Sequence, residues 1–203
     1  VILHAKQAAD YFLLIGPPGT GKTSMALQYL VREHEGKNIL LLSYTNRAVD
    51  EICGMLTENN IPFLRLSKEY SCDPQYTNNL LSNAVKNNPT LIHIKQTISQ
   101  ARIIVRTTAN LSIHTAIFSI KHFELAIIDE ASQILEPNIV GLLAAHNGEK
   151  QVIDKFILIG DYKQLPAVVQ QDSEESATNS HLLENIHLPN CANSLFERLI
   201  LTE

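Results

Sequence analysis

The residues best suited to do chemistry in this chain begin with a glycine-rich turn. It reads Gly16-Pro17-Pro18-Gly19-Thr20-Gly21-Lys22-Thr23, and it separates an apolar run at 11–15 from a segment of helical character at 24–31. Such a turn brings backbone N–H groups close to phosphate oxygens, and the N-terminus of the following helix adds partial positive charge. Lys22 would reach the β- and γ-phosphates, and the Thr23 hydroxyl would ligate Mg²⁺. The sequence therefore predicts a nucleotide-binding loop from Gly16 to Ser24; the alternative is a glycine-rich turn without a ligand.

A second chemical signal is the carboxylate pair Asp129-Glu130. Four apolar residues, 125–128, precede it, so both acids are expected at the C-terminal end of a buried strand. In this Walker B arrangement Asp129 would hold Mg²⁺ and Glu130 would act as a general base on the attacking water. Strands often end in acids, so the pair alone is a weak signal. Its combination with an upstream phosphate loop makes it a strong one.

Apolar runs predict the strands that position these residues. They lie at 11–15, 38–43, 63–66, 101–108, 125–130 and 155–161. Helices are expected at 1–10, 24–31, 47–58, 111–118, 138–145 and 194–201. The runs are continuously apolar rather than alternating, which is typical of a parallel sheet covered on both faces. The pattern predicts a three-layer α/β domain, whose ligand lies at the C-terminal edge of the strands.

Two segments depart from this alternation. Residues 67–100 carry Asn-Asn pairs, prolines and many polar groups, and we expect a mainly helical insertion with helices near 78–86 and 91–99. Residues 171–190 are polar with an acidic cluster, and they are expected to form a mobile loop. The domain as a whole would span 1–203.

Composition narrows the class of protein. The 203 residues carry a formal net charge of −5, which argues against a simple basic nucleic-acid binder. The seven basic residues between 65 and 121 face only two acidic ones, so a local basic region could hold a polyanion; solvated lysines without a partner are the alternative. Three widely spaced cysteines and the lack of a membrane-length apolar run favour a soluble protein in a reducing, intracellular setting, cytoplasmic if bacterial.

Three motifs, in a fixed order along the chain, make the prediction of a nucleotide-binding protein more specific. Gly16–Thr23, Asp129-Glu130-Ala131-Ser132-Gln133 and Gly160-Asp161-Tyr162-Lys163-Gln164-Leu165-Pro166 resemble motifs I, II and III of superfamily 1 helicases. The resemblance is closest to the 5′→3′ branch, which includes the nonsense-mediated-decay RNA helicase and the Okazaki-fragment nuclease-helicase. Residues 43–50 resemble motif Ia, and 193–199 resemble the segment after motif III. The similarity covers nearly the whole chain, with 67–100 matched least.

The resemblance implies a RecA-like P-loop fold that binds ATP and Mg²⁺. Gln164 would sense the γ-phosphate, and Gln133 would help to order the site. The nucleic-acid backbone of a single strand of DNA or RNA would be contacted by Ser43, Thr45, Asn46, Thr107 and Thr108. Short hydroxyl and amide side chains at strand ends can bond phosphates without reading sequence. For the four residues other than Ser43, helix capping is the structural alternative.

Two departures from the family pattern limit what this chain is expected to do alone. Gln7 precedes the loop at less than the spacing of the family's adenine-reading glutamine, so that role is not assigned to it. Motifs IV to VI, with the arginines of a second RecA-like domain, have no counterpart here. We expect the motor half of a helicase, poorly active by itself. The competing hypotheses are a nucleotide-gated scaffold and a small-molecule P-loop kinase.

Overall fold

A six-stranded parallel sheet forms the centre of the computed structural model, which describes residues 2–17, 25–113, 115–164 and 167–202. Its strands are β1 (Tyr11–Ile15), β2 (Ile39–Ser43), β3 (Leu64–Arg65), β4 (Ile103–Thr107), β5 (Leu125–Ile128) and β8 (Phe156–Gly160). They lie in the order β1-β8-β5-β2-β4-β3, and every neighbouring pair is parallel. The predicted α/β class and parallel sheet are therefore confirmed.

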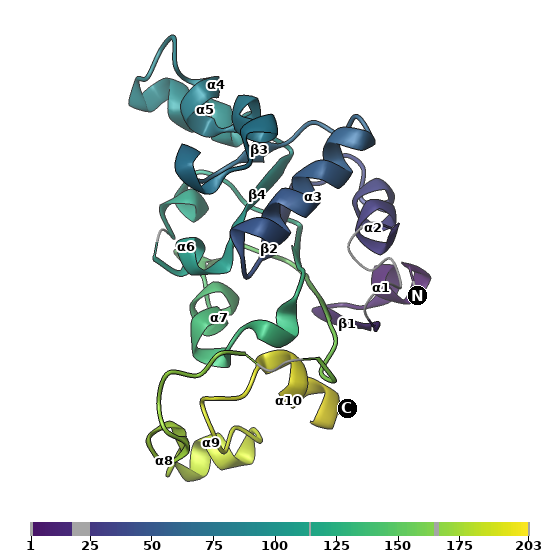
Figure 1. Ribbon diagram of the computed structural model, residues 1–203, viewed down its shortest axis with the longest axis vertical. Helices are drawn as coiled ribbons and strands as arrows, with labels where there is room; N and C mark the ends of the chain where they lie inside the picture. The colour runs from purple at the N-terminus through teal and green to yellow at the C-terminus, as the bar shows by residue number, and fades with distance from the viewer. Residues whose placement is uncertain (1, 18–24, 114, 165–166, 203) are drawn as a thin grey trace.

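Helices connect and cover the strands (Figure 1). The α-helices are α1 (Ile2–Gln7), α2 (Leu27–Glu33), α3 (Asn46–Glu58), α4 (Leu81–Ala84), α5 (Leu91–Gln100), α6 (Thr108–Ile113), α7 (Glu136–Leu143), α8 (Ser173–Ser176), α9 (His181–Asn185) and α10 (Leu195–Thr202). Short 3₁₀ helices are η2 (Glu69–Ser71), η3 (Pro74–Asn79), η4 (Thr115–Ser119) and η5 (Ala131–Gln133). Among the helices of these described residues, none is both long and apolar enough to cross a membrane.

The sheet separates two apolar cores, and successive residues of each strand alternate between them. Ile157 and Ile159 of β8 pack with α1, α2 and α3, whereas Phe156 and Leu158 pack with α5, α6, α7 and α10. The strands β2, β4, β5 and β8 are apolar and buried on both faces because helices remove both faces from water, whereas β1 at the sheet edge is half-buried, with Tyr11 and Ile15 exposed. This two-sided burial holds the strand ends in fixed positions along one edge of the sheet.

The two segments that depart from the strand–helix alternation, 67–100 and 171–190, both contain short helices. Residues 67–100 contain η2, η3, α4 and α5, which agrees with the predicted helical character. Residues 171–190, predicted as a mobile loop, contain the short helices α8 and α9, so this segment is not a loop throughout. The helix expected at 111–118 begins at Thr108 and gives way to η4. A small hairpin, β6 (His146–Asn147) with β7 (Lys150–Gln151), was not predicted.

The predicted basic region is not a continuous charged surface. Arg65, Arg106 and Lys121 are buried, and none is more than 6% exposed. Arg65 is paired with Asp50, and its guanidinium also donates to Ser67 and Ser71. Lys121 donates from Nζ to the Ser99 carbonyl at 2.8 Å. Counting charges along the sequence could not predict that these cations are buried, because burial and ion pairing depend on residues that are distant in the sequence.

Candidate functional site

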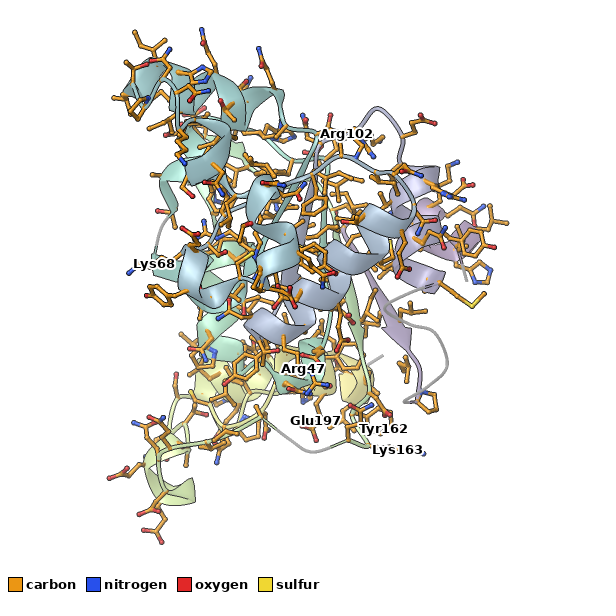
Figure 2. The ribbon with its side chains drawn as sticks, turned by 45° about the horizontal axis from the view of Figure 1, so that its top comes forward. Arg47, Lys68, Arg102, Tyr162, Lys163 and Glu197 are labelled. Carbon is orange, nitrogen blue, oxygen red and sulfur yellow. The ribbon has the colours of Figure 1, made fainter. Side chains whose placement is uncertain are left out.

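The C-terminal edge of the sheet gathers three of the predicted motifs. β8 lies between β1 and β5, so Gly16, Asp161 and Asp129 follow adjacent strands. The Gly16 N–H donates to the Gly160 carbonyl at 3.2 Å, which extends the β1–β8 pairing to the start of the loop. In Figure 2, Arg47, Tyr162 and Lys163 lie in the lower half of the view, and Arg102, which precedes β4, lies in the upper half.

Most of the glycine-rich turn lies outside the described residues. Gly16 is buried and Pro17 is exposed at the end of β1. Predictions for Pro18, Gly19, Thr20, Gly21, Lys22, Thr23 and Ser24 fall on residues whose placement is not described. The strand before this turn and the helix after it, α2, stand where the motif requires them.

Asp129 lies deep in the edge, with 3% of its surface exposed. Its N–H donates to the Leu42 carbonyl of β2 at 2.8 Å, and its Oδ1 accepts from the Glu130 N–H at 3.0 Å. A buried carboxylate at this position fits Mg²⁺, which prefers oxygen ligands and is usually held by one or two carboxylates together with phosphate oxygens and water. Within the described ranges, no cluster of three or more His, Cys, Asp or Glu residues forms a self-sufficient metal site.

Glu130 stands on a left-handed turn with φ of 55° and ψ of 35°. Positive φ is uncommon outside glycine, and such strain often marks functional sites. The Ser43 hydroxyl donates to Glu130 Oε2 at 3.5 Å and to the Asp129 carbonyl at 3.3 Å. Glu130 is half-buried. A residue predicted to contact nucleic acid is thus hydrogen-bonded to the predicted general base.

Gln164 is positioned by a turn anchored on Asp161. Asp161 is buried, its Oδ1 accepts from the Lys163 N–H at 3.0 Å, and its carbonyl accepts from the Gln164 N–H at 3.2 Å. The Asp161 N–H in turn donates to the Ser132 hydroxyl at 3.3 Å. These bonds tie the end of β8 to η5. Gln164 is half-buried in this arrangement.

The same junction holds Gln133 near Glu130. The Gln133 N–H donates to the Glu130 carbonyl at 2.9 Å, within the η5 turn. Gly160 permits the close approach, because a Cβ there would lie 3.0 Å from both the Ser132 nitrogen and the Phe196 ring. The helix α10 thereby packs directly behind the site. The motifs include Ser132 and Asp161 but gave them no role, because the bonds that their side chains accept from backbone N–H groups cannot be predicted from the residue order alone.

The predicted nucleic-acid residues differ in exposure. Thr45 and Asn46 are exposed, whereas Ser43, Thr107 and Thr108 are each no more than 5% exposed. Ser43 and Thr107 are register partners on β2 and β4. The Thr45 hydroxyl caps α3 by accepting from the Ala48 N–H at 3.1 Å, so the capping alternative is realised there. Contacts of these residues with a strand stay predictions.

Two further features were not predicted. The Arg198 guanidinium forms a two-pronged ion pair with Glu136, at 2.7 and 2.6 Å, which joins α10 to α7. Arg106 is 6% exposed, and its Nε has no hydrogen-bond partner within the described residues. Burial lowers the pKa of the Arg106 guanidinium to about 10. The sequence signal that could have indicated a buried arginine is the position of Arg106 inside the apolar run 101–108.

The parallel sheet with helices on both faces and phosphate-site motifs at one edge defines a RecA-like α/β motor domain. A family model described as "AAA domain" matches residues 1–91 and 82–172. The chain therefore belongs to the AAA domain family.

Curated relatives are DNA replication helicase/nucleases. The chain is 38% identical over 174 residues to the DNA replication ATP-dependent helicase/nuclease DNA2 of Saccharomyces cerevisiae, covering 82% of this chain and 10% of that protein. It is 37% identical over 167 residues to the Homo sapiens protein of the same name, covering 79% and 14%. The chain thus spans only a small part of these relatives.

A solved structure supports the fold. The UvsW helicase from bacteriophage T4 aligns with a TM-score of 0.53 and 15% identity, over 78% of this chain and 49% of that one. At this identity the similarity bears on the fold alone. The family match and the curated relatives confirm the predicted N-terminal motor domain of a superfamily 1 helicase.

Proposed function

We propose that this chain is the first motor domain of an ATP-dependent helicase that moves along single-stranded nucleic acid. The observation that carries the proposal is the order of strand ends along one edge. The ends of β1, β8 and β5 carry the nucleotide motifs. The end of β2, next to β5, and that of β4, next to β2, carry the residues proposed for the strand. One edge would then hold ATP on one half and nucleic acid on the other.

On the nucleotide half, the residues have distinct proposed roles. The loop Gly16–Ser24 cradles the phosphates, and Lys22 neutralises them. Thr23 and Asp129 hold Mg²⁺, which supplies charge neutralisation between the phosphates when it is bound. Glu130 takes a proton from the attacking water, and Gln164 contacts the γ-phosphate, with Gln133 ordering the turn between them. The buried position of Asp129 and the constrained backbone of Glu130 support these roles.

On the strand half, Thr45 and Asn46 are proposed to bond backbone phosphates directly, since both are exposed at the start of α3. Thr107 and Thr108 lie at the end of β4 beside them and are buried; they are assigned to the strand by the family resemblance. Ser43 is assigned a linking role. Its hydroxyl reaches the Glu130 carboxylate, so a change at the general base is transmitted to β2.

The domain organisation is part of the proposal. Residues 1–203 form one RecA-like unit with 67–100 as an insertion, and a second RecA-like domain supplies arginines to the far wall of the ATP site. Hydrolysis then opens and closes two domains around the nucleotide. Both relatives are named as ATP-dependent helicase/nucleases, which supports an ATP-driven motor.

The test is a comparison of ATP hydrolysis with and without single strands of DNA and of RNA. Residues 1–203 alone should bind nucleotide weakly and turn it over poorly, because the arginines of a second domain are missing. Robust, strand-stimulated hydrolysis by residues 1–203 alone would contradict the two-domain mechanism. Binding of labelled DNA and RNA strands at several salt concentrations decides which nucleic acid the edge prefers.

A further inference from the structure

A cavity of about 440 Å³ lies between the end of β4 and the helices of residues 67–100. Arg106, Lys68, Ser67 and Ser82 supply its polar lining, and Leu66, Leu81 and other aliphatic side chains supply its apolar wall. Its volume is within the range of about 300–1,000 Å³ that is usual for ligand pockets. The Leu66 N–H donates to the Val105 carbonyl at 3.0 Å, which holds 66–68 beside β4.

Arg106 is a cation without an anion in the described part of the chain. It points to the same face of the sheet as Ile104, among apolar neighbours, and no hydrogen bond or ion pair of its guanidinium is found among the described residues. Arg65, on the neighbouring strand, is buried too but has Asp50, Ser67 and Ser71 as partners. A buried charge is costly unless it is paired. Arg106 therefore lacks a partner that Arg65 has.

The remaining polar groups suit an anion. Ser67 Oγ accepts from Arg65 Nε at 3.0 Å, which leaves its own proton able to donate into the cavity. Lys68 lies at the rim, where Figure 2 shows it pointing outward, with its Nζ 5.6 Å from the Tyr70 ring centroid. An arginine fork matches the oxygens of a phosphate in two-pronged geometry. Among the described residues that line the cavity, none carries a carboxylate.

We propose that this cavity binds one phosphate group of the nucleic-acid strand, with Arg106 as its principal ligand and the apolar wall against the attached nucleotide. The assignment rests on the proposed function, since it places the cavity beside Thr107 and Thr108 at the same sheet edge. It adds a contact that fixes the path of the strand past β4 towards the insertion 67–100. Phosphate held free or on a mononucleotide is the competing source of the same chemistry.

The test is the binding of a fluorescently labelled single-stranded oligothymidine to the full chain over a series of salt concentrations. Arg106→Met removes the charge at similar volume, and it should raise the Kd about tenfold and reduce the salt slope by about one. Arg102→Met is the matched control, because it removes the same charge at the opposite end of β4, and it should change the Kd less than about twofold.

Two further arms keep the test decisive if Arg106→Met does not fold. Ser82→Trp fills the cavity with the charge retained, and it should weaken binding as strongly as Arg106→Met. A neutral methylphosphonate linkage, placed at each position of the oligonucleotide in turn, should weaken binding to the wild-type chain. If Arg106 binds one particular phosphate, the methylphosphonate at that position should not weaken binding to Arg106→Met any further, because the variant already lacks the contact that the neutral linkage removes.

The outcomes separate the claims. Wild-type affinity in both Arg106→Met and Ser82→Trp overturns the inference while strand binding stands. A wild-type chain that binds no oligonucleotide overturns the proposed function instead. If thymidine monophosphate or inorganic phosphate raises the Tm of the wild-type chain but not of Arg106→Met, and the oligonucleotide Kd is unchanged between them, the site takes free phosphate and the assignment to the strand is wrong.

Discussion

The contact between Ser43 and Glu130 is the residue-scale feature with the widest consequence. Glu130 sits in left-handed backbone, and its carboxylate lies within reach of a hydroxyl on the neighbouring strand β2. The motifs predicted both residues but assigned them to different ligands. Their contact was not predictable, because it depends on β5 and β2 being neighbours in the sheet and on the turn at Glu130.

The first prediction concerns this contact. Ser43→Ala in a protein that joins this chain to the proposed second motor domain should lower the maximal ATP hydrolysis rate about three- to tenfold. The reason is the loss of one hydrogen bond that orients the base. Nucleotide affinity should change less than about twofold, because Ser43 does not line the phosphate loop. Ser119→Ala, which removes an exposed hydroxyl, is the control. Equal rates in the two variants would remove the linking role from Ser43.

A second residue-scale prediction concerns Cys53, which is fully buried on α3. Burial raises the pKa of its thiol from 9.0 to about 12, against a smaller opposing effect of Arg65. The unfolded chain loses this proton first as pH rises. The stabilising contribution is therefore complete below pH 9 and is lost as pH rises towards 12, at about 1.4 kcal/mol per pH unit.

Urea unfolding across that window measures the effect. The unfolding midpoint of the wild-type chain should fall more steeply with pH than that of Cys53→Ala, although the variant is less stable at neutral pH because it leaves a small cavity. Cys191→Ala, which changes a half-exposed thiol, should keep the wild-type slope. Parallel slopes in wild type and Cys53→Ala would show that the thiol does not carry this pH dependence.

At the scale of elements, packing behind the edge is what fixes the site. The last residue of β8, Gly160, lies against η5 and α10, and the Arg198–Glu136 pair joins α10 to α7. The strands β2, β4, β5 and β8 could be predicted because their apolar runs are continuous and are covered on both faces. The helices α8 and α9 could not, because segments of four or five residues are too short to show a periodic apolar face.

The prediction at this scale is a pair of glycine substitutions. Gly160→Ala should lower the free energy of unfolding by about 1–3 kcal/mol, because the new Cβ meets the Ser132 backbone nitrogen and the Phe196 ring at 3.0 Å. Gly141→Ala in α7 should raise it by about 0.5–1 kcal/mol, since no described atom beyond its neighbours and its own helix backbone lies within 4 Å of the added Cβ, and alanine favours the helix. Denaturant unfolding of both variants gives the comparison. A stable Gly160→Ala would mean that the junction with α10 is loosely packed.

At the scale of the whole molecule, the strand order determines which motifs meet. The sequence places phosphate loop, carboxylate pair and Gln164 at strand ends, but only the order β1-β8-β5-β2-β4-β3 puts them on neighbouring strands. The predicted basic region fails at this scale. Three of its cations, Arg65, Arg106 and Lys121, are inside the molecule, and one of them, Arg106, now has a different proposed role.

The measurement that tests the central proposal most directly is strand-stimulated ATP hydrolysis by the two-domain protein, with Glu130→Gln compared with wild type. Single strands should stimulate the wild-type rate. Glu130→Gln should reduce hydrolysis at least about a hundredfold, because the general base is lost, while the affinity for the labelled strand stays within about twofold. A Glu130→Gln protein that hydrolyses ATP at the wild-type rate would contradict the account and favour a nucleotide-gated scaffold.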